Sequence, residues 1–344
     1  MQPLQKSLLP PARMLLHSCK NSYMPANPLI SVCIPVYNAE KTLLECILSA
    51  ALQDFEKFEI LVVNDGSPGK DDNGNNCKKL VKLAEKQSTA KRKKLNLSKI
   101  SIKYIEHKTN LGLVEARRTA VEYAKGEYIC CLDSDDFLLP DALASLYQTA
   151  STTNADIVQG KTDTTQKYYN VFLGSLEGPQ IFDGYIKTQN HSGFLWAKLI
   201  RRQTYLKALS YIPFTNCVMA EDLLQYFFIS YEAKKYEGID KIVYHYSTNS
   251  GISSNKQIDS LARWEQVCST ANVFTIIFSK IAEMPENSFT LEQLEALRLQ
   301  SRSLLLNNLQ QLKHNVVPQL RDEAYSLLCD YWGSDFVEFV ERSL

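Results

Sequence analysis

Three carboxylates stand together directly after a short apolar run. Residues 128–132 have the character of a buried strand, and Asp133, Ser134, Asp135 and Asp136 follow at once. Successive side chains of an extended segment point to opposite faces, so Asp133 and Asp135 point the same way while Ser134 points away. Like charges this close oppose each other's ionisation unless a cation lies between them. Hard oxygen ligands on a short loop suit Mg²⁺ or Mn²⁺, so the cluster predicts a divalent-metal site.

Two other kinds of carboxylate site have comparable spacing. An EF-hand loop is excluded, because the glycine that such a loop needs at its sixth position is Leu138 here. A phosphatase of the haloacid type also begins with two spaced aspartates after a strand. Asp133 and Asp135 alone therefore leave phosphatase chemistry open.

Strand and helix patterns alternate between residues 30 and 132. Short β-branched and apolar runs predict strands, and apolar residues spaced three and four apart predict helices. We expect strands at 30–36, 58–63, 100–105 and 128–132, and helices at 40–52, about 76–87 and 112–125. This alternation is typical of an α/β fold with a mostly parallel, Rossmann-like sheet, which binds ligands beyond the carboxyl ends of its strands. Asp65 and Asp133 fall at two such ends.

Length and composition narrow the class of protein. The 344 residues can bury one large core and a smaller unit, so we expect a catalytic domain with an appendage. The 38 basic and 38 acidic residues balance, which argues against a nucleic-acid-binding protein. Nine cysteines form no Cys-x-x-Cys pair, and no apolar stretch approaches the roughly 20 residues that cross a bilayer. We therefore expect a cytoplasmic protein that at most rests on the inner face of a membrane.

A basic segment and both ends of the chain stand apart from this pattern. Residues 78–99 carry nine basic residues against one acid, which indicates either a solvated surface or a patch attracted to an anionic membrane or acceptor. Residues 1–28 contain several prolines and no sustained period, so we expect a mobile extension. After about residue 255 the pattern is helical. Its leucine stripe between Leu291 and Leu312 favours packing on the core, and a dimer or membrane contact is the alternative.

Four motifs in order resemble those of the family 2 nucleotide-sugar glycosyltransferases, which have the GT-A fold. The motifs are Ile34-Pro35-Val36-Tyr37-Asn38, Val63-Asn64-Asp65-Gly66-Ser67, Asn110-Leu111-Gly112 with Ala116-Arg117, and Asp133-Ser134-Asp135-Asp136. The resemblance continues through Trp196-Ala197-Lys198, Glu221-Asp222 and Tyr244-His245-Tyr246. It implies a GT-A domain at 29–255, with a nucleotide-binding half at about 29–136 and an acceptor half at about 137–255. A C-terminal helical region at 256–344 follows.

The first two motifs are expected to hold the nucleoside. Pro35 and Tyr37 end the first strand, where an aromatic ring can support a flat nucleobase, and the carboxylate of Asp65 can accept an N–H from the base. The resemblance implies that this base is uracil. The residue types alone also allow Tyr37 to be an ordinary half-buried aromatic residue, and Asp65 a turn residue before Gly66.

Asn110 and Arg117 flank the start of the helix expected at 112–125. Asn110 suits a helix N-cap, and Arg117 follows within the first turns, so a helix dipole and a guanidinium could both face phosphate or base. A simple cap and a surface charge are the alternative.

For the acidic cluster, the resemblance implies a division of labour. Asp133 and Ser134 lie at the nucleotide sugar, Asp135 binds the Mn²⁺ or Mg²⁺ ion that bridges the diphosphate, and Asp136 supports them. In many members of the family a histidine at the position of His245 completes the metal shell, and neutral imidazole is a competent ligand for Mn²⁺. A histidine between two tyrosines on a strand is otherwise a hydrogen-bonded structural residue.

Glu221 and Asp222 open an apolar helical run and are the expected catalytic pair. Asp222 would be the general base for the acceptor hydroxyl, and Glu221 would bind the acceptor or position the base. A base opposite the leaving group gives single displacement with inversion. Acids in a first helical turn also favour the helix dipole without any catalytic role. Trp196 and Lys198 are expected to line the sugar or acceptor cleft, with core packing as the alternative for Trp196.

The resemblance thus implies a metal-dependent inverting enzyme that transfers a sugar from a UDP-sugar to a glycan or glycolipid in bacterial surface polysaccharide or lipooligosaccharide synthesis. A non-catalytic nucleotide-sugar-binding or assembly protein on a decayed transferase fold is the alternative. A processive synthase is disfavoured, because its Gln-x-x-Arg-Trp signature is missing: Ser260 stands where glutamine is required before Arg263-Trp264. The sequence leaves a homodimer open.

Overall fold

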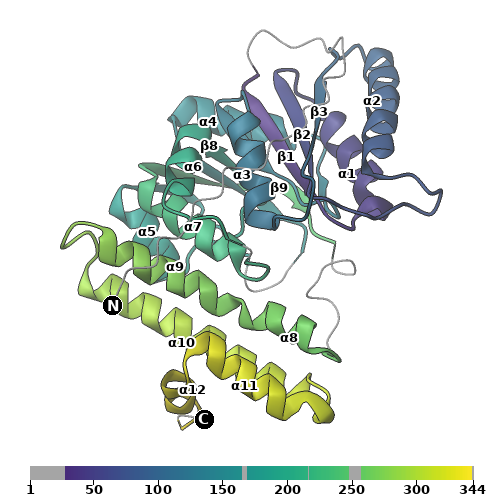
Figure 1. Ribbon diagram of the computed structural model, residues 1–344. Helices are drawn as coiled ribbons and strands as arrows, with labels where there is room; N and C mark the ends of the chain where they lie inside the picture. Colours follow the sequence, from purple (N-terminus) through teal and green to yellow (C-terminus); the bar gives the residue numbers. More distant parts are fainter. Residues whose placement is uncertain (1–27, 165–168, 216, 248–256, 343–344) are drawn as a thin grey trace, which may run out of the picture.

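A computed structural model describes residues 28–164, 169–215, 217–247 and 257–342 (Figure 1). The extension expected at residues 1–28 lies outside the described residues, apart from Pro28, which is buried. The described chain forms one mixed sheet of nine strands between helices. A group of helices from the C-terminal part lies below the sheet in the view of Figure 1.

The first half of the sheet is parallel and follows the predicted strands to within one residue at each end. Its strands are β1 (Ile30–Val36), β2 (Phe58–Asn64), β3 (Ser101–Glu106) and β4 (Tyr128–Cys131), in the order β3-β2-β1-β4. Every residue of β1 and β2 is buried, which explains their nearly continuous apolar sequence. Because all four strands are parallel, the loops that follow β1, β2 and β4 meet at one edge.

Three helices connect these strands: α1 (Glu40–Ala51), α2 (Cys77–Lys94) and α3 (Leu113–Tyr123). Helix α2 runs to Lys94, beyond the end predicted at about residue 87, and one of its basic residues, Arg92, is only 1% exposed. The Arg92 guanidinium donates to the backbone oxygens of Ala51, Gln53 and Phe55 at 3.0 to 3.1 Å. Arg92 therefore joins α2 to the end of α1 and does not belong to a surface patch.

The second half of the sheet is mixed. Its strands are β5 (Phe137–Leu138), β6 (Ile157–Thr162), β7 (Gly174–Glu177), β8 (Lys198–Arg201) and β9 (Lys235–His245). Its helices are α4 (Ala142–Thr153), α5 (Pro179–Ile186), α6 (Arg202–Leu209) and α7 (Glu221–Glu232). The order β8-β6-β9-β5 continues from β4, with β7 on β9. Because β8 is antiparallel to both β4 and β6, the direction changes there.

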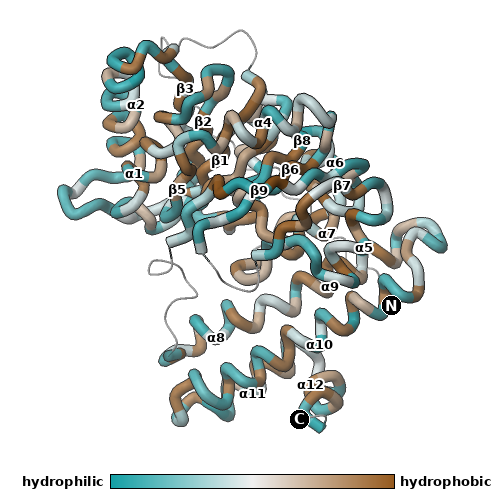
Figure 2. Tube along the Cα trace, turned by 180° about the vertical axis from the view of Figure 1, so that it is seen from behind, coloured by the Kyte–Doolittle hydropathy of each residue, from teal (hydrophilic) through white to brown (hydrophobic). Residues whose placement is uncertain are grey.

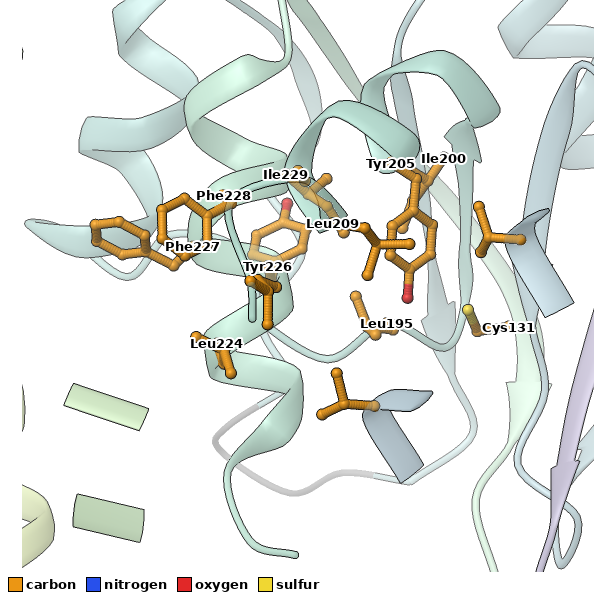
Figure 3. Packing of buried hydrophobic residues seen from close by; sticks show 14 of the residues in the cluster. Cys131, Leu195, Ile200, Tyr205, Leu209, Leu224, Tyr226, Phe227, Phe228 and Ile229 are labelled. Carbon is orange, nitrogen blue, oxygen red and sulfur yellow. The ribbon is translucent and has the colours of Figure 1, made fainter. Parts of the chain in front are cut away.

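Two hydrophobic clusters cover the two faces of the sheet. Val32 and Ile34 of β1 join a cluster with α1, α2 and α4, whereas the intervening Cys33 joins a cluster with α3, α5, α6 and α7. This alternation is what an extended strand requires when both of its faces are covered. Figure 3 shows the second cluster around α7, with the labelled side chains Cys131, Leu195, Ile200, Tyr205, Leu209, Leu224, Tyr226, Phe227, Phe228 and Ile229. The packing fixes the helix that begins with Glu221 and Asp222.

The C-terminal helices are α8 (Leu261–Cys268), α9 (Thr270–Glu283), α10 (Leu291–His314), α11 (Arg321–Trp332) and α12 (Ser334–Glu341). Figure 2 shows them from behind, with apolar positions distributed along each helix. Leu297 of α10 joins the cluster behind α7, whereas Leu305 and Leu309 pack around Trp264 in a third cluster. Leu291, at the start of the predicted stripe, is 85% exposed. Within the described ranges, no helix has both the length and the apolar character of a membrane span.

Candidate active site

Three segments meet at the carboxyl edge of the parallel strands. Asp133 follows β4, Glu221 and Asp222 are the first two residues of α7, and Arg117 lies in the second turn of α3. Although Arg117 and Asp222 are 105 positions apart in the sequence, their side chains are in contact. The fold therefore brings the expected nucleotide and catalytic residues to one place.

Arg117 is the centre of this arrangement. Its Nη2 donates to Asp133 Oδ1 at 3.0 Å, and its Nη1 donates to Asp222 Oδ1 at 2.5 Å and to Glu221 Oε1 at 3.5 Å. The side chain is 1% exposed, and its Nε has no hydrogen-bond partner among the described residues. A buried guanidinium needs nearby anions to offset its desolvation, and three carboxylates supply them. We expected Arg117 to face phosphate or base; the structure shows these carboxylates instead.

The cluster shifts the titration of both catalytic candidates. Burial raises the pKa of Glu221 to about 8, the charge of Asp222 raises it further, and Arg117 opposes both effects. Burial also raises the pKa of Asp222, with Arg117 acting against this shift and Asp133 adding to it. Glu221 therefore carries a proton at neutral pH and can donate a hydrogen bond, while Asp222 is the carboxylate held by the guanidinium. The two acids are distinct in chemistry although adjacent in sequence.

Asp65 is 3% exposed and holds the loop in front of α3. Its Oδ1 accepts hydrogen bonds from His107 Nδ1 at 2.7 Å and from the backbone N–H of Leu111 at 2.8 Å. Its Oδ2 accepts from the backbone N–H of Gly112 at 2.9 Å. The sequence gave no reason to select His107, whose other ring nitrogen hydrogen-bonds Thr119 on α3. Asp65 thus fixes the start of the helix that carries Arg117, in addition to any contact with a base.

Asn110 is not the N-cap that the sequence predicted. Helix α3 starts after Gly112, which has a φ of 93°, and Asn110 Oδ1 accepts from the Gly112 N–H at 2.9 Å. The positive φ explains the difference, because only glycine adopts it readily and the helix start therefore moves to Gly112. Gly66 is constrained in the same loop cluster: its φ is +66°, and an added Cβ would lie 2.6 Å from the Thr109 carbonyl carbon.

Replacing Asp65 by Asn is expected to lower the free energy of unfolding by about 3 kcal/mol, because charge-assisted hydrogen bonds are lost and an amide N–H would face a backbone N–H. Urea denaturation followed by circular dichroism measures this. Asp72→Asn is the matched control: Asp72 is exposed and pairs with Lys41 at 2.9 Å, so we expect a change within about 0.5 kcal/mol. Equal effects of the two substitutions would contradict the assigned role of Asp65.

The loop after β1 is tied to the loop after β2. Ser67 Oγ donates to Glu40 Oε1 at 2.6 Å and accepts from the backbone N–H of Asn38 at 2.8 Å. Glu40 is only 2% exposed, and the sequence analysis did not select it, although an acid in a first helical turn was a visible signal. Between these contacts Pro35 is buried in β1, whereas the Tyr37 ring is 48% exposed. Tyr37 is therefore accessible to a ligand.

The acidic loop divides into buried and accessible groups. Ser134 is buried, and its carbonyl accepts from Thr42 Oγ1 at 2.9 Å. Asp136 is 1% exposed and accepts from the Tyr244 hydroxyl and the Ser247 N–H, each at 2.8 Å. Burial raises the pKa of Asp136 to about 7. The Asp133 side chain is 27% exposed, and Asp135 is also partly exposed, so these two can reach a ligand.

His245 lies beside the acidic loop because β5 pairs with β9. Phe137, two positions after Asp135, is opposite His245 in this pairing, and the two rings are 5.6 Å apart. His245 Nδ1 hydrogen-bonds Asp163, an arrangement that orients metal-binding histidines in other proteins. Among the described residues, no group of three or more His, Cys, Asp or Glu side chains is close enough to hold a metal by itself. Asp135 and His245 fit a metal that also takes ligands from a bound molecule.

The structure corrects the expected cleft position of Trp196. This side chain is 4% exposed and lies between two parallel rings. Its centroid is 4.9 Å from that of Phe194, with planes 16° apart, and 5.1 Å from that of Tyr244, with planes 18° apart. Trp196 is therefore a core residue below the acidic loop, because the isolated β-bridge with Cys131 places it next to β4.

Lys198 is also buried, with no exposed surface, so it does not line a cleft. Its ammonium donates to the Phe194 carbonyl at 2.5 Å and to Ser192 Oγ at 3.1 Å, and lies 4.9 Å from the centroid of the Tyr226 ring. Burial lowers the pKa of Lys198 to about 7, while nearby Asp222 opposes this shift. The loop that Lys198 holds includes Leu195, whose N–H donates to Asp222 Oδ2 at 3.4 Å. Lys198 therefore supports the catalytic candidate from behind.

Known proteins share this sequence pattern. The model of the family described as Glycosyl transferase family 2 matches residues 31–209, just over half of the chain. Glycosyltransferase GlyA of Streptococcus pneumoniae is 30% identical over 190 residues, a match that covers 51% of this chain and 25% of GlyA. The chain thus matches only a quarter of that relative's length.

Solved structures share the fold over nearly the whole chain. S. aureus TarS 1-349 in complex with UDP-GlcNAc has a TM-score of 0.50 at 20% identity, covering 91% of this chain and 92% of TarS 1-349. Mannosyltransferase PcManGT from Pyrobaculum calidifontis, in complex with GDP-Man and Mn²⁺, has a TM-score of 0.50 at 16% identity, covering 94% and 86% of the two chains. The expected α/β fold is confirmed. The chain is a glycosyltransferase that belongs to family 2 and adopts the GT-A fold.

Proposed function

We propose that this glycosyltransferase moves a sugar from a UDP-sugar to a hydroxyl group of a glycan or glycolipid, with inversion at the anomeric carbon. One observation carries the proposal. Arg117 contacts Asp133, the expected ribose residue, at 3.0 Å and Asp222, the expected base, at 2.5 Å. The groups that would hold the donor and activate the acceptor therefore lie on either side of one guanidinium.

The nucleotide would bind across the loops after β1, β2 and β4. The half-exposed Tyr37 offers a ring for the uracil, supported by Pro35 and the loop that Asp65 fixes. Asp133 and Ser134 would face the ribose. The complex of TarS with UDP-GlcNAc, a protein of the same fold, supports a UDP-sugar as donor.

Asp135 and His245 would hold a Mn²⁺ or Mg²⁺ ion together with the diphosphate. Asp163 would keep the imidazole in place through its hydrogen bond. When bound, such an ion stabilises the negative charge of a departing nucleoside diphosphate. The Mn²⁺ complex of PcManGT supports the same class of cofactor here.

The reaction would be a single displacement. The acceptor oxygen forms a bond to the anomeric carbon, the bond from that carbon to the diphosphate oxygen breaks, and UDP leaves with the electron pair. Asp222 takes the proton of the acceptor hydroxyl. The Leu195 N–H, in the loop held by Lys198, fixes the second oxygen of this carboxylate. Protonated Glu221 would donate a hydrogen bond to the acceptor.

We place the enzyme in bacterial surface polysaccharide or lipooligosaccharide synthesis, acting in the cytoplasm or at the inner face of the membrane. Release of UDP from a panel of UDP-glucose, UDP-galactose and their N-acetyl forms, with Mn²⁺, tests the function. Release that increases with a glycan acceptor is the expected result. Tight binding of a UDP-sugar without any release or transfer would instead favour the non-catalytic alternative.

His245→Ala is expected to raise the Mn²⁺ concentration for half-maximal transfer at least tenfold, because one of two protein ligands is lost. Titration of Mn²⁺ into enzyme treated with a chelator measures the change. His314→Ala, at an exposed histidine on α10, is the control and should leave the titration curve in place. A wild-type metal dependence for His245→Ala would reject the assignment.

A further inference from the structure

The C-terminal helices enclose a second hollow that none of the site residues lines. It has a volume of about 650 Å³ and lies between α9, α10, α11 and α12. A volume of this size is typical of pockets that bind small molecules. The hollow is therefore large enough for a ligand of its own.

Aromatic rings form most of its wall. The Phe274 ring lies 6.0 Å from Trp332 and 6.5 Å from Phe278, and Trp332 lies 6.2 Å from Phe336. Phe339, on the hydrophobic α12 visible in Figure 2, adds a ring that is 61% exposed. Exposed apolar surface within a concave site favours a ligand with an apolar body.

The polar lining is positively charged. Arg298 and Arg302 contribute two cations against one acid, Glu295. Glu295 lies 3.7 Å from Arg298 in a largely exposed pair, which binds weakly. The Arg302 guanidinium lies 5.7 Å from the centroid of the Phe339 ring, and its buried Nε has no partner in the part of the chain that the structure describes. Arg302 thus supplies hydrogen-bond donors and a charge that the protein itself does not neutralise.

We propose that this hollow binds an anionic amphiphile, a hydrocarbon chain that ends in a phosphate group, with the chain along the aromatic wall and the phosphate on Arg302. The apolar wall discriminates against free inorganic phosphate, and the unneutralised cation discriminates against uncharged amphiphiles. A second copy of this chain fits less well, because a stable protein interface needs about 800 Å² on each partner rather than one hollow with a charged lining.

The test uses the whole protein and a series of alkyl phosphates from butyl to decyl, each below its micelle concentration. Trp332 reports binding by its fluorescence, since the other two tryptophans, Trp196 and Trp264, are buried elsewhere. We expect saturable binding, with a dissociation constant that falls up to about fourfold for each added methylene group. Calorimetry with Trp332→Phe confirms that the optical signal and the binding have the same origin.

Arg302→Gln is expected to weaken decyl phosphate binding at least tenfold, and Leu299→Glu, which adds a negative charge at a 56% exposed position of the lining, should abolish it. Arg342→Gln removes the same charge from an exposed site at the end of α12 outside the lining and should change nothing. The proposal is overturned by equal binding of decyl maltoside, by equal binding of inorganic phosphate, or by an unaltered affinity of Arg302→Gln. Self-association that decyl phosphate does not displace would also overturn it. UDP release with a water-soluble acceptor monitors the proposed transferase site separately.

Discussion

Asp222→Asn is expected to lower kcat for sugar transfer by about 10³-fold, because a positioned general base contributes factors of this order. The amide can still accept the hydrogen bond that Arg117 donates to Oδ1, so the local geometry should be kept. We expect KM for the UDP-sugar to change by less than about threefold, since the acceptor proton is transferred only in the transition state. Steady-state kinetics of UDP release with acceptor measure both constants.

The pH profile gives a second measurement for the same substitution. Burial raises the pKa of Asp222 above the usual aspartate value of 3.8, and kcat/KM should rise with pH as this carboxyl loses its proton. Asp222→Asn should remove that acid limb. Glu221→Gln imitates the protonated glutamate and should cost at most about tenfold in kcat. Near-full activity of Asp222→Asn with an unchanged pH profile would remove Asp222 from the role of base.

Arg117→Met is expected to lower the free energy of unfolding by about 3–5 kcal/mol, because it leaves Asp133, Glu221 and Asp222 facing one another without their cation. Activity should fall as well. Arg117 lowers the pKa of Asp222 in the intact enzyme, so its loss moves the acid limb of kcat/KM to higher pH. Urea denaturation measures the first effect, and kinetics across the pH range measure the second.

Arg117→Lys separates charge from geometry. A lysine ammonium keeps the positive charge but lacks the planar fork that reaches Asp133 and Asp222 at once. We expect it to restore part of the stability and part of the shift in the pH profile, while kcat stays low. If Arg117→Met unfolded with the wild-type free energy and titrated like the wild type, the three carboxylates would not depend on this guanidinium.

The sequence predicted the parallel half of the fold well because its strands are buried on both faces. An apolar run such as that of β1 has few alternatives once helical patterns flank it. The positions of Asp65, Asp133 and Asp222 near one edge follow from the same logic, since parallel strands deliver their following loops to a common side. The motifs thus indicated where the functional residues gather.

The contacts among those residues could not be read in the same way. That Arg117 reaches Asp222 depends on how α3 and α7 cross, a property of packing between segments 105 positions apart. Lys198 was expected in a cleft because lysine is rarely buried, yet a carbonyl, a hydroxyl and an aromatic face together accommodate it. The left-handed backbone of Gly112 displaced the predicted cap, and no side-chain pattern encodes that choice.

Helix α10 belongs to two hydrophobic clusters, and this has a consequence for how the protein unfolds. Leu297 and the α9 residues Phe274 and Ile277 share a cluster with Leu224 and Phe227 of α7. A chain shortened at residue 255 would expose this apolar face of the helix that carries Asp222. The helices after residue 255 and the catalytic half should therefore lose structure together, as one cooperative unit. Changes in α9 would then reach the chemistry through the stability of α7, without any contact with substrate.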